Sequence, residues 1–155
     1  TITAGNSSGI NDGAAMMLIA SDTAVKKYDI NPIAEIISVS ETSIEPENFG
    51  IAPVSAIKKA LDLAYLKLSD IKLFELNEAF AAQSLSVLRE LEITSDFINV
   101  NGGAVALGHP IGASGARIIV TLIHEMIKRN VEFGLASICI GSGEAMATII
   151  KNLNI

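Results

Sequence analysis

The stretch "IKLFELNEAFAAQSLSVLREL", residues 71–91, changes its hydrophobic period halfway along, and this change indicates the class of fold. Residues 71–77 alternate as a strand does, whereas residues 78–91 repeat their apolar side chains at helical spacing. The helical set comprises Phe80, Leu85, Leu88 and Leu91. A strand that passes directly into a helix is typical of layered α/β domains, so we expect an α/β fold.

The same alternation of strands and helices extends over the whole chain. Besides residues 71–77, apolar runs of strand length predict strands at residues 14–20, 33–40, 97–101, 133–141 and 144–152. Helical spacing and start signals, with Ser21 as an N-cap, predict helices over residues 21–28, 53–66, 78–91 and 114–129. The last two strands are separated by a short turn of small residues, which is typical of an antiparallel hairpin. We therefore expect the strands after residue 22 to form a mixed five-stranded sheet with helices on both faces.

The composition excludes several classes of protein. The 155 residues are 50% apolar and 18% charged, which favours a folded domain with a sizeable core over a disordered chain. The formal net charge of −6 leaves no basic surface, so we expect no nucleic-acid partner. No apolar run reaches the about 18 residues that a membrane span requires, and residues 1–12 lack the features of a secretion signal. We expect a cytoplasmic protein without a membrane partner.

Cys139 is the single cysteine, so the sequence can hold neither an internal disulfide framework nor a cysteine-rich zinc site. Its thiol leaves two interpretations open, an inert buried group or a reactive one. It ends a predicted apolar strand and is followed by Gly141 and Gly143, so it would face a cleft beside exposed amide groups.

The glycines of "ALGHPIGASGAR", residues 106–117, fit neither the dinucleotide fingerprint nor the phosphate loop, so we expect no phosphate cradle here. They predict instead a tight turn before a helix. Gly108 and Gly112 would allow close backbone approach, and Pro110 would fix the chain. His109 would then be held rigidly at a helix start, either as a satisfied turn residue or as a catalytic group.

Asn77 and Glu78 lie where the strand of residues 71–77 meets the following helix. As structural residues, Asn77 would be the N-cap and Glu78 a first-turn charge that favours the helix dipole. As functional residues, they would lie at the mouth of a sheet, where open α/β folds hold ligands. Asn77, His109 and Cys139 all fall at the ends of predicted strands and can converge on one pocket. Such a trio suits acyl transfer or proton abstraction beside a carbonyl, because His and Asn donate to an oxyanion and Cys moves a proton.

At these residues the chain resembles the C-terminal half of the thiolases, and most of all the biosynthetic acetyl-CoA acetyltransferases, or acetoacetyl-CoA thiolases. The motifs "TAGNSSGINDGAA", "NEAFAAQ", "NVNGGAVALGHPIGASGAR" and "CIGSG" occur in the order of the family. The resemblance implies a thiolase-like layered fold. In it, residues 1–22 would be the end of the N-terminal domain, a loop and its last strand, and residues 23–155 the C-terminal domain.

The resemblance also implies an activity, the Claisen condensation of two acetyl-CoA molecules to acetoacetyl-CoA and the reverse thiolysis. In such an enzyme His109 would activate a nucleophilic cysteine and later donate to the thioester oxygen, while Asn77 would hold a water at the same oxyanion site. Cys139 would remove the proton from the acetyl methyl group. The backbone amide of Gly141 would help to bind the other oxyanion, beside the nucleophile.

The remaining implications concern ligands and assembly. Ser8 matches a serine that contacts the pantetheine arm of CoA, with Ala4 nearby, and Phe80 is assigned to the same binding set. No metal and no permanently bound cofactor is implied, because the CoA thioester itself activates the carbon. Family members are usually dimers or tetramers, so we expect the full-length protein to be a homo-oligomer.

One departure from the family is decisive for function. Cys139 is already assigned as the base, so the chain holds no candidate for the cysteine that accepts the acyl group. We therefore expect a fragment, the C-terminal catalytic portion of the enzyme, which is inactive alone. Two alternatives stay open, a degradative 3-ketoacyl-CoA thiolase for longer chains and a non-catalytic thiolase-like acyl-CoA-binding domain. Phe49, where relatives often carry methionine, would favour short acyl groups.

Overall fold

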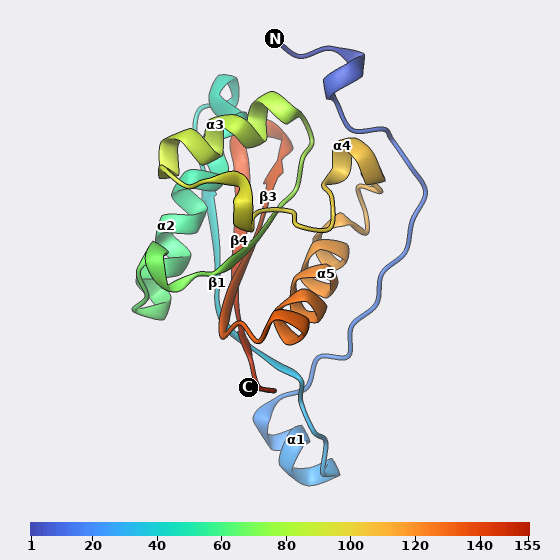
Figure 1. The fold of residues 1–155 in the computed structure, drawn as a ribbon, viewed down its shortest axis with the longest axis vertical. Helices are drawn as coiled ribbons and strands as arrows, with labels where there is room; N and C mark the ends of the chain where they lie inside the picture. The colour runs from blue at the N-terminus through green and yellow to red at the C-terminus, as the bar shows by residue number, and fades with distance from the viewer.

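The computed structural model describes residues 1–155 and contains one mixed sheet between layers of helices (Figure 1). The strands are β1 (Ala34–Ser43), β2 (Leu73–Leu76), β3 (Phe133–Ile140) and β4 (Glu144–Asn152). Their order across the sheet is β1-β4-β3-β2. β4 pairs antiparallel with both β1 and β3, whereas β2 and β3 are parallel. The α/β class, the mixed sheet and the terminal hairpin of β3 and β4 are confirmed, but the sheet has four strands and not five.

The missing strand is the one predicted at residues 97–101. Only Ile98 forms a bridge to the sheet, opposite Phe74 of β2. Asn99 turns into the left-handed region, with φ of 47°, and so ends the extended conformation. Its side-chain Oδ1 accepts a hydrogen bond from the Leu76 amide and its Nδ2 donates to the Leu76 carbonyl, both at 2.8 Å. A side chain therefore takes the place that a fifth strand would have occupied beside the end of β2.

The strand predicted at residues 14–20 is also absent. This segment has no regular secondary structure, and Met16 and Leu18 are 91% and 87% exposed. Figure 1 shows it running along the outside of the molecule past α5. An apolar run becomes a strand only where another strand can pair with its backbone, and this segment pairs with none in the chain.

The chain has five α-helices: α1 (Asp22–Tyr28), α2 (Ala52–Ala64), α3 (Ala81–Leu91), α4 (Ala104–Leu107) and α5 (Ser114–Arg129). Short 3₁₀ turns lie at Ala4–Asn6, Pro46–Ile51, Leu68–Asp70, Ser95–Phe97 and Gly141–Gly143. Ser21 caps α1 as predicted, accepting a hydrogen bond of 3.2 Å from the Ala24 amide. None of the helices is both long and apolar enough to traverse a lipid bilayer.

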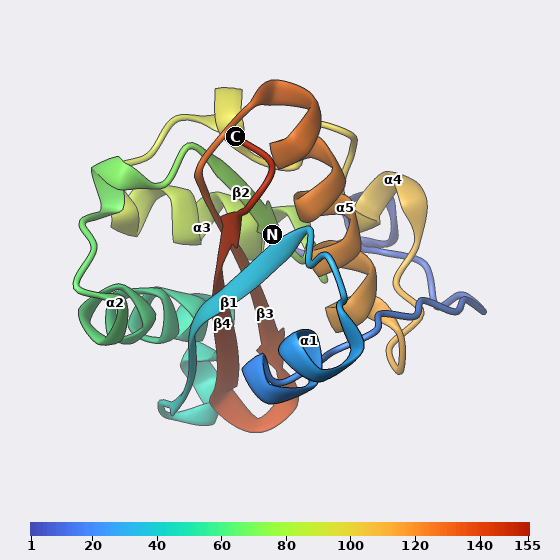
Figure 2. The same ribbon diagram turned by 90° about the horizontal axis from the view of Figure 1, so that it is seen from below.

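The helices bury two separate cores. α2 and α3 cover one face of the sheet and α5 covers the other, as Figure 2 shows. Phe74 and Leu76 of β2 belong to the core under α2 and α3, whereas Leu73 packs against Ile118 and Leu122 of α5. Because successive side chains of a strand point to opposite faces, Glu75 lies on the α5 side. The fold thus places the Glu75 carboxylate on the same side of the sheet as the apolar side chains packed under α5.

The helix after β2 begins later than predicted. Its first residue is Ala81 and its N-cap is Phe80, so the interpretations of Asn77 as N-cap and Glu78 as a first-turn charge are wrong. Asn77 instead continues the ladder of β2, since its amide donates to the Ser137 carbonyl at 2.9 Å. Val87 and Leu91 are the apolar side chains that α3 buries, while Leu85 is 64% exposed. The predicted apolar face of this helix is therefore only partly correct.

Candidate active site

The site begins at the carboxyl ends of two parallel neighbouring strands. Leu76, the last residue of β2, is in register with Ser137 of β3. Asn77 follows directly after β2, and Cys139 lies two residues beyond Ser137 near the end of β3. Neighbouring parallel strands end at the same edge of a sheet. The topology therefore brings Asn77 and Cys139 to one edge.

His109 reaches the same edge from the connection between α4 and α5. Its Nε2 lies 3.1 Å from the Asn77 Nδ2, and its Nδ1 lies 2.7 Å from the Ser114 Oγ. The imidazole is thus held at both ring nitrogens. Asn77 is 1% exposed and Ser114 is 1% exposed, so both partners belong to the interior.

The turn that carries His109 needs one of its two predicted glycines for close approach. Gly108 has φ of 99°, and a Cβ there would lie 2.4 Å from the Oδ1 of Asn11. The His109 amide donates to the Gly9 carbonyl at 3.0 Å, which fixes the N-terminal segment against this turn. Gly112 was predicted in the same role, but a Cβ there would meet nothing within 4 Å. The close approach predicted for Gly112 is wrong.

Burial sets the protonation states of the two proton-carrying groups. Burial, and to a lesser degree the Arg117 guanidinium, lower the pKa of His109 below its ordinary value. Burial raises the pKa of the Cys139 thiol, which is 9% exposed. At neutral pH the site therefore holds a neutral imidazole, which can accept a proton, and a thiol, which can donate one.

The Asn77 side chain has an unused hydrogen-bonding group. Its Oδ1 is buried and has no hydrogen-bond partner, whereas its Nδ2 is engaged by His109. Buried polar atoms without a partner are uncommon in folded proteins, and an ordered water or a ligand often supplies the missing bond. A donor such as a bound water is therefore expected beside Asn77.

Glu78 has a role that the sequence did not indicate. Its carboxylate accepts hydrogen bonds from the Asn99 Nδ2 at 3.2 Å and from the Val105 amide at 3.1 Å. These bonds join the segment after β2 to the loop that leads through α4 to His109. The one feature of the sequence that could have pointed to this role is the pair of adjacent glycines at 102 and 103, because Gly103 packs directly against the Glu78 carboxylate.

A buried carboxylate, that of Glu75, lies behind the site on β2. Glu75 is 2% exposed and its Oε2 is 3.4 Å from the Arg117 Nη1 of α5. Burial raises the pKa of Glu75 to about 7, while Arg117 opposes this rise. In the sequence Glu75 looked like an ordinary polar residue of an alternating strand, so its burial was not predicted.

Gly141 lies in the turn between β3 and β4. It is exposed, and a Cβ there would meet nothing within 4 Å. In contrast, Gly143 has φ of 89° and a Cβ there would lie 2.3 Å from the Ile44 carbonyl oxygen. Within this chain the turn requires glycine at 143 for its own packing, whereas nothing in the chain's packing requires it at 141.

The residues expected to contact CoA are only partly gathered. The amide and the hydroxyl of Ser8 both donate to the Ala79 carbonyl, at 3.0 and 3.1 Å, beside Phe80. The Phe80 ring packs edge-on against Phe49, with ring centroids 6.1 Å apart. Ala4 lies further along the N-terminal segment in an exposed 3₁₀ turn. The structure therefore joins Ser8 and Phe80 through Ala79 but does not link Ala4 to them.

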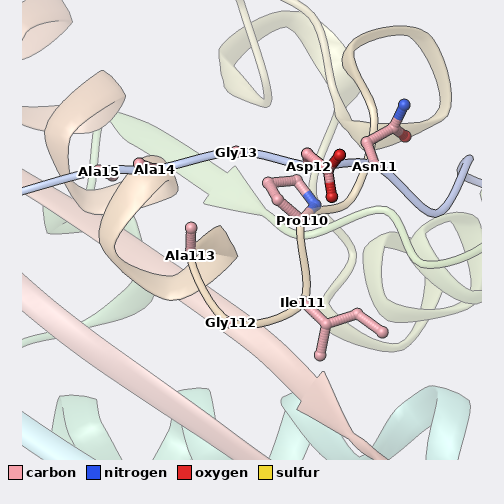
Figure 3. Close-up of a pocket in the computed structure, with 9 residues that line it drawn as sticks. All are labelled: Asn11, Asp12, Gly13, Ala14, Ala15, Pro110, Ile111, Gly112 and Ala113. Carbon is pink, nitrogen blue, oxygen red and sulfur yellow. The ribbon is translucent and has the colours of Figure 1, made fainter.

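A small open cavity of about 400 Å³ adjoins the His109 turn. It lies between residues 11–15 of the N-terminal segment and residues 110–113, and Figure 3 shows Pro110 facing Asp12 while Ile111 points away. Its walls are mostly backbone and small side chains. No group of three or more His, Cys, Asp or Glu side chains that could hold a metal ion occurs in the chain.

Known proteins similar to this chain share its fold over nearly its entire length. Residues 30–152 match the family described as the thiolase C-terminal domain. A probable acetyl-CoA acyltransferase of Staphylococcus aureus is 55% identical over 151 residues, which are 97% of this chain and 38% of the relative. The crystal structure of the Bacillus anthracis acetyl-CoA acetyltransferase has a TM-score of 0.95 at 46% identity, covering 98% of this chain and 39% of that one.

A solved complex with CoA is also similar. The human mitochondrial 3-ketoacyl-CoA thiolase in complex with CoA has a TM-score of 0.89 at 42% identity, over 97% of this chain and 38% of that one. The chain thus spans well under half the length of each of these relatives.

Proposed function

Since the chain belongs to the thiolase family, we propose that it is the C-terminal catalytic portion of an acetyl-CoA C-acetyltransferase. The reaction is the Claisen condensation of two acetyl-CoA molecules to acetoacetyl-CoA and free CoA, together with the reverse thiolysis. The observation that carries this proposal is the contact of 3.1 Å between His109 and Asn77, at the sheet edge where β3 brings Cys139. A CoA thioester is the substrate, and the complete protein is a homo-oligomer of the cytoplasm.

The first half of the reaction transfers an acetyl group to a cysteine thiol outside this chain. His109 is neutral because its pKa is lowered, so it accepts the proton of that thiol. The thiolate attacks the acetyl carbonyl and CoA leaves as a thiolate. Cys139 is still protonated, because its pKa is raised, and it gives its proton to the leaving CoA. This step leaves Cys139 as the thiolate that the second half requires.

In the second half the Cys139 thiolate removes a proton from the methyl group of another acetyl-CoA. The negative charge moves to the thioester oxygen, where protonated His109 and a water held by Asn77 donate hydrogen bonds. The unpartnered Oδ1 of Asn77 supports a bound water at this place. The carbanion attacks the acetyl-enzyme, and the released cysteine thiolate recovers its proton from His109. All protons are then back on their original groups.

We further propose that residues 1–22 belong to a preceding domain and that the chain is inactive alone. In support, the family match begins at residue 30, and residues 14–20 are mostly exposed despite their apolar character. The same segment lines an apolar groove of about 980 Å³ together with Ile119 and Ile123 of α5. Cys139, the only cysteine, is already used as the acid and base, so the acyl-accepting thiol has to come from elsewhere.

A thiolase for longer 3-ketoacyl chains is the second candidate, because the human 3-ketoacyl-CoA thiolase is 42% identical to this chain. The packing of Phe49 against Phe80 favours the short substrate, since these rings leave less room than flexible side chains would. A non-catalytic acyl-CoA-binding domain is disfavoured, because such a domain has no need of His109, Asn77 and Cys139 at one edge.

The test compares thiolysis by this chain alone with thiolysis by the full-length product of its reading frame. Acetoacetyl-CoA and a longer 3-ketoacyl-CoA serve as substrates, each with free CoA. We expect turnover only by the full-length protein, and faster with acetoacetyl-CoA. Turnover by the chain alone would mean that another group accepts the acyl chain. Faster turnover of the long substrate would favour the second candidate, and binding without turnover in the full-length protein would favour the non-catalytic domain.

A further inference from the structure

The two ring nitrogens of His109 have partners of different chemical character. At Nε2 the partner is the Asn77 Nδ2, 3.1 Å away, which is an amide nitrogen and can only donate. Nε2 must therefore accept, and it carries the lone pair. A neutral imidazole has one proton, which then resides on Nδ1.

The partner at Nδ1 leads independently to the same tautomer. The Ser114 Oγ lies 2.7 Å from Nδ1 and 3.0 Å from the Pro110 carbonyl oxygen. A hydroxyl has a single proton to donate, and a carbonyl can only accept. The Ser114 hydroxyl therefore donates its hydrogen bond to the Pro110 carbonyl. Ser114 is then an acceptor toward His109, and Nδ1 must donate to it.

Ser114 is itself fixed. It is the first residue of α5, it is 1% exposed, and its amide also donates to the Pro110 carbonyl, at 2.8 Å. The Pro110 carbonyl therefore accepts hydrogen bonds from both the amide and the hydroxyl of Ser114. Because the serine is buried, bulk water is not available to replace its oxygen beside Nδ1.

We propose that Ser114 is a positioning residue that fixes His109 in the tautomer with a proton on Nδ1 and directs Nε2 toward Asn77 and the reacting groups. The tautomer follows from this chain alone, whereas its chemical use rests on the proposed function. In that reaction Nε2 takes the proton of the nucleophilic thiol. The resulting Nε2–H group then donates a hydrogen bond to the thioester oxygen. The proton on Nδ1 stays there throughout, hydrogen-bonded to the Ser114 Oγ, so Nε2 alone performs both steps.

The tautomer can be measured directly because the chain has only two histidines. Nitrogen-15 NMR of the labelled imidazoles distinguishes protonated from unprotonated ring nitrogens, and the variant His124→Gln identifies the signals of His109. His124 is exposed on α5, so this change should not disturb the fold. Above the titration of His109 we expect a protonated Nδ1 and an unprotonated Nε2. A protonated Nε2 in the unsubstituted chain would overturn the proposal without any variant at Ser114.

The variant Ser114→Ala removes the acceptor at Nδ1, so only the orientation of the Asn77 amide still opposes a proton on Nε2. Because the Asn77 Oδ1 has no other partner, that amide can turn over and accept from Nε2, and we expect a substantial population of the other tautomer. Ser114→Thr keeps a hydroxyl and should restore the original tautomer. Ser84→Ala is the matched control, because Ser84 is also buried but its Oγ has no partner. It should leave His109 unchanged. An unchanged tautomer in a folded Ser114→Ala variant would overturn the role of Ser114.

Activity separates this proposal from the proposed function. In the full-length protein Ser114→Ala should lower kcat for thiolysis about 100-fold, the lower end of what a general acid–base group contributes. KM for the CoA thioester should change little, and Ser114→Thr should recover part of the rate. If the tautomer is as expected but the unsubstituted full-length protein does not catalyse thiolysis, the proposed function fails and the assignment of Ser114 stands.

Discussion

Gly103 lies so close to the Glu78 side chain that a Cβ atom at position 103 would be 2.0 Å from the Glu78 Cδ. The backbone of Gly103 is extended, with φ of −106°, so the absence of a side chain is required by packing and not by a left-handed conformation. The carboxylate that it accommodates accepts from the Asn99 side chain and the Val105 amide. The hydrogen bonds of Glu78 therefore fix the position of the loop before His109.

Gly103→Ala should displace Glu78 and break its hydrogen bonds with Asn99 and Val105. We expect a loss of about 1–3 kcal/mol in the free energy of unfolding, the usual cost of overpacking a filled site. Urea unfolding of the chain measures this loss. Gly112→Ala is the control, since a Cβ there would meet nothing within 4 Å, and it should change stability by less than about 1 kcal/mol. Equal effects at the two glycines would contradict the role given to Glu78.

Elements defined by local signals were predicted well. The bounds of α5 agree with the predicted helix of residues 114–129, because an apolar stripe and basic residues in the last turn depend only on neighbouring residues. The β3 and β4 hairpin was likewise predicted from two apolar runs and a short turn. Such elements need no knowledge of distant partners.

Elements that depend on distant partners were predicted poorly. The run of residues 14–20 has the composition of a strand but finds no strand to pair with. Residues 97–101 lie beside β2 but form no strand for a different reason. The Asn99 side chain occupies the hydrogen-bonding groups of Leu76 that a strand there would have used. Propensity cannot reveal either outcome, because both are decided by tertiary contacts.

The candidate site shows the same division. Positions at strand ends, together with the family resemblance, were enough to select Asn77 and Cys139. His109 was selected by its glycine-rich turn and the resemblance, but the expectation that it follows a strand is wrong, because it follows α4. The burial of Glu75 and the hydrogen bonds of Glu78 to Asn99 and Val105 could not be predicted from the sequence, because a glutamate in a strand or before a helix usually faces solvent. Ser114 was overlooked because a serine at a helix start ordinarily suggests only a cap.

Glu75 should make the stability of the chain depend on pH near neutrality. Burial raises its pKa to about 7 in the folded state, from 4.5, so the folded state binds more protons between these values. The stability that Glu75 contributes is fully present below pH 4.5 and is lost as the pH rises through about 7. The shift corresponds to roughly 3 kcal/mol at most.

The variant Glu75→Gln isolates this effect, because glutamine resembles the protonated side chain at every pH. Urea unfolding of both proteins at pH 5 and pH 8 gives two differences in the free energy of unfolding. We expect the unsubstituted chain to lose stability relative to Glu75→Gln on going from pH 5 to pH 8. A difference that does not change with pH would show that Glu75 titrates at its ordinary value.

The Cys139 thiol should react slowly with alkylating reagents. It is the only cysteine and it is 9% exposed, so modification of the folded chain reports on this one buried sulfur. Because burial raises its pKa, less thiolate is present at a given pH than in a free thiol. At pH 8 we expect iodoacetamide to react more slowly with the folded chain than with a cysteine peptide, and at the peptide's rate in urea. A folded chain that reacts as fast as the peptide would contradict the raised pKa.

In the proposed reaction, Cys139 and His109 should differ in which half they affect, and the full-length protein allows the halves to be measured separately. Exchange of labelled CoA into acetyl-CoA follows acyl transfer to the nucleophile, and formation of acetoacetyl-CoA follows the whole condensation. Cys139→Ala should lower the rate of condensation by about 100-fold or more, because no thiolate remains to remove the methyl proton.

Exchange should be reduced in Cys139→Ala but remain measurable, since water can protonate the leaving CoA thiolate. His109→Ala, in contrast, removes both the acceptor of the nucleophile's proton and a donor to the thioester oxygen, so exchange and condensation should fall together. Condensation by Cys139→Ala at the parent rate would show that another group is the base. Retention of exchange by His109→Ala would show that the nucleophile is activated without the imidazole that Asn77 and Ser114 hold in place.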